Sequence, residues 1–112
     1  MTLANITSLA NQLLDDVKVY VGATWTDEDT EQNIIHEIEN GIREISNVGG
    51  DSIDPTTNAD GSRALIFNYV LYARSGSLPD FRNNYREDLM NLALSARIAS
   101  LKAKEDDDED DS

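Results

Sequence analysis

The amino-acid sequence predicts an all-α fold: a small four-helix domain with a long loop between helices 2 and 3 and an extended C-terminal helix. Apolar residues recur at three- and four-residue steps in four separate segments, as they do in amphipathic helices. Clusters of glycine, serine, aspartate and proline lie between these segments, which is the pattern of turns and loops. A chain of 112 residues is long enough for one domain with a modest core.

The first helix is expected over about residues 5–21. Its apolar stripe consists of Ile6, Leu9, Leu13, Val17 and Val21. We expect helix as far as Leu14, because the residues beyond it also fit a short strand in which Val17, Val19 and Val21 alternate. Gly22 is the expected stop.

The second helix has the clearest pattern and is expected to run from Thr26, as its N-cap, to about residue 48. Acidic residues at 27–29 lie where the helix dipole favours negative charge. One face carries a strict series of isoleucines: Ile34, Ile38, Ile42 and Ile45. Isoleucine is a poor helix former, so packing must hold this helix together. Gly41 weakens the helix by roughly 1 kcal/mol relative to alanine and would permit close approach by a neighbouring element.

Residues 49–62, GGDSIDPTTNADGS, form the predicted long loop. The segment is rich in turn residues, and Pro55 directs Asp54 toward extended geometry. A short strand around Ile53 is an alternative. Long loops in compact domains are often functional or disordered, so two interpretations stay open. The loop is either a mobile surface segment, or an arm that orders against a neighbour through Ile53, Asp54, Pro55 and Thr56.

The third helix is expected over about residues 62–75 and is apolar on most of its sides. A helix that is apolar all round has to be covered, either by a larger core or by partners. A domain of this size has few other elements to cover it. This helix is therefore the first indication that the chain forms oligomers.

The fourth helix is expected from about residue 79 to residue 103, after a break that has Gly76 as its C-cap. Pro79 and Asp80 suit the first helical turn. Two overlapping apolar stripes follow: Phe81, Tyr85, Leu89, Leu92, Ala96 and Ala99, and then Leu94, Ile98 and Leu101. About 25 helical residues span roughly 37 Å, so the distal end is expected to project. The acidic residues beyond it oppose the helix dipole, so we expect the helix to fray there.

The formal net charge is −13, and residues 105–111, EDDDEDD, account for seven of these negative charges, which leaves −6 for the rest of the chain. We therefore expect a helical domain over residues 1–104 and an acidic tail over residues 105–112. Such a surface repels phosphate and disfavours ordinary nucleic-acid binding. Three interpretations of the tail stay open. It is a solvated, disordered segment, or it docks on a basic surface of a partner, or it repels DNA inside a channel. No secretory leader or membrane-spanning segment is predicted, so we expect a soluble protein.

The sequence predicts no catalytic residue, no metal site and no cofactor. There is no cysteine, so no thiolate metal site is possible, and the only histidine, His36, lies in no HExxH motif and in no Glu-x-x-His pairing on two helices. The serines lack a nucleophile-elbow context, and the glycine turns lack the lysine of a phosphate-binding loop. The acids at 27–31 fit a helix start better than a calcium loop.

Three arginines around the start of the fourth helix give this acidic chain a local positive edge: Arg74, Arg82 and Arg86. They either form ion pairs with Glu87, Asp80 or Asp88 of the same chain, or contact an acidic patch on an adjacent copy. Arginine and tyrosine are enriched at interface hot spots, and a head-to-tail contact forms a ring when its rotation closes. On the second interpretation the subunit interface contains Phe67, Tyr69, Tyr72, Arg74, Phe81, Arg82, Tyr85 and Arg86.

The order of these segments resembles the small head–tail connector proteins of tailed bacteriophages, also called adaptor or head-completion proteins. The likeness covers about residues 10–101 and rests on TDEDTEQNIIHEIENGIREI, the turn-rich loop, and ALIFNYVLYA. It also rests on LPDFRNNYREDLMNLAL, which is similar to the usual Phe-x-x-x-Tyr-x-x-x-Leu-x-x-Leu pattern of the final helix. The matching positions are Ile34, Ile38, Ile42 and Ile45, and then Phe81, Tyr85, Leu89 and Leu92.

This resemblance implies a structural virion protein, not an enzyme, in the neck of the particle at the head–tail interface. It implies a homo-oligomeric ring of twelve copies that docks beneath the portal protein and receives a tail-completion or stopper protein. DNA would pass through the lumen without specific binding, and the ring would be assembled in the host cytoplasm without a membrane. The heavily acidic C-terminus is not a general feature of that family.

The alternative function is a small acidic regulatory or inhibitory binding protein of the DNA-mimic type. Such proteins present carboxylates at phosphate-like spacing and so occupy a DNA-binding site. The moderate charge of residues 1–104 argues against this class, because most of the excess negative charge lies in the tail.

Overall fold

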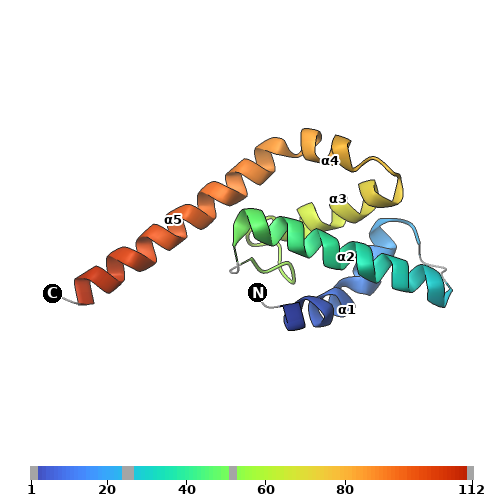
Figure 1. The fold of residues 1–112 in the computed structure, drawn as a ribbon, viewed down its shortest axis with the longest axis horizontal. Helices are drawn as coiled ribbons and strands as arrows, with labels where there is room; N and C mark the ends of the chain where they lie inside the picture. Colours follow the sequence, from blue (N-terminus) through green and yellow to red (C-terminus); the bar gives the residue numbers. More distant parts are fainter. Residues whose placement is uncertain (1–2, 24–26, 51–52, 111–112) are drawn as a thin grey trace.

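The computed structural model describes the backbone of residues 3–23, 27–50 and 53–110, and the side chains of residues 6–23, 27–50 and 53–102. This part of the chain contains five α-helices and no strand, which confirms the predicted all-α class (Figure 1). The helices are α1 (Leu3–Tyr20), α2 (Glu28–Gly49), α3 (Ser62–Arg74), α4 (Leu78–Asn84) and α5 (Arg86–Asp110).

Helix α2 is the centre of the fold and packs against α1, α3 and α5 (Figure 1). Its isoleucines form the predicted face and are fully buried, because their spacing keeps them on one side of the helix: Ile34, Ile38, Ile42 and Ile45. Gly41 permits the expected close approach. A Cβ atom at this position would lie 3.0 Å from Cδ1 of Tyr69 on α3.

The start of α2 differs from the prediction by one residue. Asp27 is the N-cap, and its carboxylate accepts a hydrogen bond of 2.8 Å from the backbone N–H of Thr30. Hydrogen bonding from Thr30 lowers the pKa of Asp27. The predicted cap, Thr26, lies outside the described residues. The cap prediction was wrong because aspartate caps as well as threonine does, and the pattern could not choose between neighbours.

Helix α1 continues to Tyr20, so the alternative of a strand near its end is wrong. A strand would bury Val17, Val19 and Val21 alike, because alternate side chains point to the same face. Val17 is instead buried, Val21 is half-buried and Val19 is 68% exposed, which is helical spacing. Gly22 has a φ of 75° and stops the helix as predicted.

Helix α3 is covered by the chain itself, and this corrects the first reason given for oligomers. It contacts α1, α2, α4 and α5. Its large apolar side chains lie in the common core: Leu65, Ile66, Phe67, Tyr69 and Val70. No local sequence pattern indicates that four helices converge on α3. The sequence therefore suggested that a partner covers α3, whereas helices of the same chain cover it.

The predicted fourth helix is two helices, with a bend at Tyr85 between α4 and α5. The two helices meet at Tyr85, whose N–H donates to Phe81 at the end of α4 and whose carbonyl accepts from Leu89 N–H at the start of α5, both at 2.9 Å. Phe81 is fully buried before the bend and Leu92 is buried after it. The apolar positions on both sides of the bend thus face the body.

Helix α5 projects from the body and ends later than predicted (Figure 1). It continues through the acidic run to Asp110, so the predicted fraying near residue 103 is wrong. Residues 105–110 form the last part of this helix. Its 25 residues contribute to a longest molecular dimension of 59 Å, against 29 and 20 Å in the other directions.

The contact that attaches α5 to α2 requires a glycine. A Cβ atom at Gly49 would lie 2.7 Å from Cγ2 of Ile53 and 2.9 Å from Cδ2 and Cγ of Leu92. Real Cβ atoms essentially never approach other atoms so closely. The last turn of α2 therefore accepts Leu92 of α5 and Ile53 only because residue 49 has no side chain.

We predict that Gly49→Ala lowers the free energy of unfolding by about 1–2 kcal/mol, because overpacking displaces Ile53 and Leu92. The gain in helix propensity, at most about 1 kcal/mol, offsets part of this loss. Urea unfolding followed by circular dichroism measures the change. Asn47→Ala, at an exposed position in the same turn, is the control and should be neutral or slightly stabilising. A Gly49→Ala protein as stable as the control would contradict the packing argument.

Candidate functional site

Four aromatic side chains meet where α3, α4 and α5 converge. The ring of Phe81 lies at the centre, with ring centroids 5.7 Å from Tyr69, 5.9 Å from Tyr72 and 5.2 Å from Tyr85. Tyr72 and Tyr85 also meet edge to face at 6.0 Å. Such pairs add to the stability that burial alone supplies. Asn84 donates a hydrogen bond of 3.2 Å to the hydroxyl of Tyr72.

The structure brings the predicted interface residues together but uses several of them for the chain's own core. Phe67, Tyr69 and Phe81 are buried, so they have little surface left for a neighbour. Phe67 contacts Tyr20 edge to face at 5.5 Å. Tyr72 and Tyr85 are half-buried and keep an exposed edge. Burial raises the pKa of Tyr85, with a smaller effect from Tyr72, so its phenol stays neutral near pH 7.

Two of the three arginines form ion pairs with acidic residues of helix α2. From the sequence alone, we considered different acidic partners, close to the arginines along the chain. Arg74 contacts Glu37 at 2.9 Å. Arg82 contacts Glu44 through two nitrogens, Nη2 at 2.8 Å and Nε at 3.1 Å. The sequence suggested Asp80, Glu87 and Asp88, which are near in sequence, but the true partners lie 37 and 38 residues away.

Arg86 differs from the other two arginines. It is exposed at the first residue of α5 and has no ion pair with any of the described residues. Of the predicted interface residues, Arg86 and the outer edges of Tyr72 and Tyr85 are therefore the groups left for a partner. A guanidinium beside aromatic edges is typical of interface hot spots.

The described part of the loop between α2 and α3 packs against the body through two side chains, and its other side chains are exposed. Ile53 and Pro55 are buried, whereas Asp54 and Thr56 are exposed. Arg63 of α3 donates to the carbonyl of Pro55 at 3.1 Å, and its guanidinium also pairs with Asp16 of α1 at 2.7 Å. The described part of the loop contains no strand.

Asp60 organises this loop. Its Oδ2 accepts the N–H of Asp54 at 2.8 Å, and its Oδ1 accepts the N–H of Ser62 at 2.9 Å and the hydroxyl of Ser62 at 2.6 Å. Burial on its own would raise the pKa of Asp60, but the hydrogen bonds from Ser62 and Asp54 outweigh burial, and the pKa is lowered. One carboxylate thus ties the start of the described loop to the first residue of α3.

A cleft of about 270 Å³ lies beside this loop, between the N-terminus of α3 and α5. Two carboxylates, Asp60 and Asp88, line it, together with Asn91 and Ser95. Its lining contains no basic residue, so it is unsuited to phosphate-bearing ligands. The serine has no histidine beside it in the lining, so the cleft offers no nucleophile–base pair.

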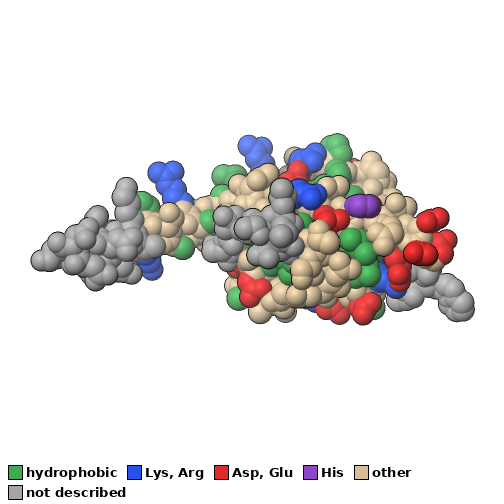
Figure 2. Space-filling view, turned by 60° about the horizontal axis from the view of Figure 1, so that its bottom comes forward, with side chains coloured by type: hydrophobic (Ala, Val, Ile, Leu, Met, Phe, Trp, Pro, Cys, Tyr) green, Lys and Arg blue, Asp and Glu red, His purple; other side chains and the backbone are tan. Residues whose placement is uncertain are grey.

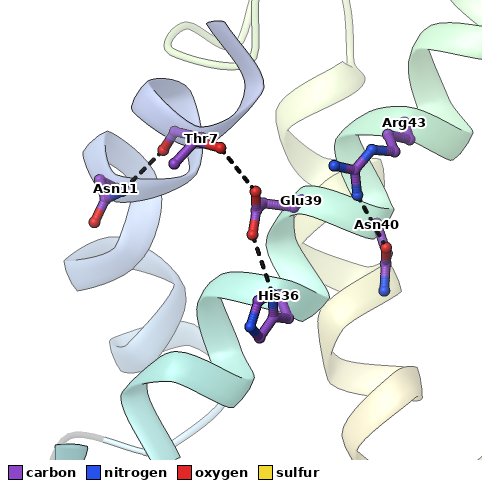
Figure 3. A network of polar contacts seen from close by, with 6 residues as sticks. All are labelled: Thr7, Asn11, His36, Glu39, Asn40 and Arg43. Atoms are coloured by element: carbon purple, nitrogen blue, oxygen red, sulfur yellow. Dashed lines mark hydrogen bonds and ion pairs between the residues drawn. The ribbon is translucent and has the colours of Figure 1, made fainter. Parts of the chain in front are cut away.

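The single histidine has a structural setting (Figure 3). His36 is 71% exposed, and its Nδ1 lies 3.3 Å from Oε1 of Glu39. The other oxygen of Glu39 accepts a hydrogen bond of 2.9 Å from Thr7 of α1 (Figure 3). Glu39 is buried, so these contacts satisfy its carboxylate and tie α1 to α2. The shallow hollow beside His36 is lined by Asn33, Glu37, Asn40, Ala73 and Arg74, none of which is a nucleophile.

Within the described residues, no group of three histidine, cysteine, aspartate or glutamate side chains is placed to hold a metal ion. No helix in the same part of the chain is both long and apolar enough to cross a membrane.

The sequence pattern missed one surface. Helix α5 exposes large apolar side chains on the side opposite the one that packs on α2, with exposed fractions of 62% at Met90, 57% at Leu94, 46% at Ile98 and 53% at Leu101. The sequence pattern assigns three of these residues, Leu94, Ile98 and Leu101, to a second apolar stripe but not to a candidate site. The two stripes were predicted to overlap, but a rotation of about 100° per residue in an α-helix places Leu94, Ile98 and Leu101 on the side opposite Leu92. A helix with one body to pack on then leaves this second stripe uncovered.

We predict that Asp60→Asn lowers the free energy of unfolding by about 1 kcal/mol at pH 7, because an amide cannot accept on both sides as the carboxylate does. The lowered pKa of Asp60 means that its contribution is complete above the ordinary value of 3.8 and is lost as the pH falls through the lower folded value. The difference between wild type and variant should therefore shrink below about pH 4.

Urea unfolding between pH 2 and pH 7 measures this difference for Asp60→Asn. The control is Asp15→Asn, at an exposed carboxylate of α1 that has no side-chain hydrogen bond to a described residue. A constant difference across this pH range would contradict the assigned role of Asp60.

Comparison with protein-family models, with curated proteins and with solved structures found no match to this chain.

Proposed function

We propose that this protein is a head–tail connector of a tailed bacteriophage. Copies of the chain would form a ring beneath the portal, join the head to the tail and extend the DNA channel. The proposal rests on the resemblance described above, in segment order and in the pattern of the last helix. In this role the protein performs no reaction and needs no cofactor.

The observation that carries the proposal is the projection of α5 from a compact helical body (Figure 1). A body of this kind can take a place in a ring, while the projecting helix reaches a second component. Most of the length of α5 extends beyond its attachment at Leu92, and its outer side is apolar. Contiguous exposed apolar faces are typical of contacts with another protein.

The charge distribution is compatible with a channel that DNA passes without binding. The chain is acidic both over residues 1–104 and in the C-terminal run. Like charges keep DNA away from such a wall. In the ring, Arg86 and the exposed edges of Tyr72 and Tyr85 would face the neighbouring copy, in the part of the predicted interface that the chain does not use for its core.

Mass photometry of the portal ring of the same phage, with and without this protein, tests the proposal. We expect a discrete increase of about 150 kDa if twelve copies of the 12.4-kDa chain bind, which is one copy per portal chain. Arg86→Glu should reduce occupancy, because it reverses the charge of an arginine at the predicted interface that pairs with none of the described residues.

Arg43→Glu is the matched control, because Arg43 is an exposed arginine of α2 outside the predicted interface. It should bind as the unchanged protein does. A portal mass that stays the same at saturating protein contradicts the connector proposal. The acidic regulatory protein would then become the leading candidate, and removal of residues 105–112 would test whether the acidic run carries that activity.

A further inference from the structure

The exposed side of α5 is an apolar stripe that no described part of the chain covers. It consists of Met90, Leu94, Ile98 and Leu101, called here the outer stripe. Steps of four, four and three residues keep these side chains on one face for about three turns. An open hollow of about 420 Å³, lined by Met90, Leu94 and Arg97 among others, lies along it. Hollows between the side chains of one helix receive the side chains of a second helix.

The charge along α5 changes sign, and this identifies the helix that fits. Residues 86–104 carry four basic and two acidic side chains, for a net charge of +2, whereas residues 105–111 carry seven acids. Figure 2 shows basic side chains on the projecting part of the molecule. In a copy that runs in the opposite direction, the acids Glu87 and Asp88 of the first turn lie near the basic residues Lys102 and Lys104, and Arg86 lies near the start of the acidic run. The charges of the two helices are therefore complementary.

We propose that the outer stripe binds the outer stripe of a second copy, with the two α5 helices antiparallel. The register follows from the apolar positions, because Met90 of each copy then lies opposite Leu101 of the other. Antiparallel helices step in opposite directions, so the same register places Arg86 opposite Glu105 and Glu87 opposite Lys104. Both ends of the seam thus pair opposite charges.

A parallel pairing is disfavoured by the same residues. In register, it would place the acids at 105–110 of one helix beside those of the other, and Arg86 beside Arg86. Like charges at close range oppose association. The antiparallel arrangement keeps the two acidic ends at opposite ends of the seam.

The contact concerns the free protein and does not rest on the proposed ring. A two-fold contact uses the same surface on both copies and closes on itself, whereas a ring needs two different surfaces. Four half-exposed side chains per copy cover less than the roughly 800 Å² per partner of a standard interface. We therefore expect a reversible dimer whose population depends on concentration.

Sedimentation velocity of the full chain over about 1–200 µM tests the proposal, because a contact of this size falls in the micromolar range. We expect a shift from monomer to dimer as concentration rises. The double variant Leu94→Gln with Leu101→Gln should raise the dissociation constant at least about tenfold, because it removes apolar surface from the seam without changing charge. Circular dichroism checks that both proteins have the same helix content.

Val19→Gln is the matched control, since Val19 is equally exposed but lies on α1 away from the outer stripe. It should leave the dimer unchanged. A monomer at every concentration overturns the proposal and assigns the outer stripe to a different protein. A dimer that the double variant does not weaken overturns it as well.

A cross-linking measurement on the same dimer reports its orientation. The chain has no cysteine, so the Met90→Cys and Leu101→Cys variants can be mixed and oxidised. A disulfide between the two variants, with little within either variant alone, is expected. Equal yields of disulfide when the Met90→Cys variant is oxidised alone would overturn the antiparallel register.

Discussion

The buried isoleucine face of α2 is the surface on which the rest of this chain is assembled. Helices α1, α3 and α5 all pack against α2, so their mutual arrangement follows from where each of them meets that one helix. Isoleucine suits this position because its branched side chain has few rotamers to lose on burial. The same property makes α2 a poor helix in isolation, so helix and core have to form together.

Charged groups at the edges of this face determine how the outer helices are oriented. Arg74 of α3 and Arg82 of α4 pair with Glu37 and Glu44, both on α2. Ion pairs at this level of exposure add little stability, typically under about 1 kcal/mol each. Each pair joins one position on α2 to one position on its neighbour, so the two pairs favour the observed alignment together with the close contacts at Gly41 and Gly49.

The parts of the fold that depend on local spacing could be predicted from the sequence, and the parts that depend on distant contacts could not. The period of Ile34 to Ile45 predicted a buried face, and Gly41 predicted a close contact. The covering of α3 could not be predicted, since it needs the positions of four other helices. The ion pair between Arg82 and Glu44 joins residues 38 positions apart, and sequence proximity pointed to the wrong acids. The bend at Tyr85 could not be predicted either, because residues 80–92 contain no glycine or proline to mark it.

The attachment of α5 at Gly49 has a mechanical consequence. The helix is held near its first turns, so a load on its far end acts through a long lever arm on a small area around Leu92 and Ile53. That contact would yield before the isoleucine face does, because Leu92 is the only described side chain of α5 in the buried core, whereas α2 contributes several isoleucines. A load on the far end of α5 would therefore displace this helix at its contact with Gly49, and the packing of α1, α2 and α3 would stay intact.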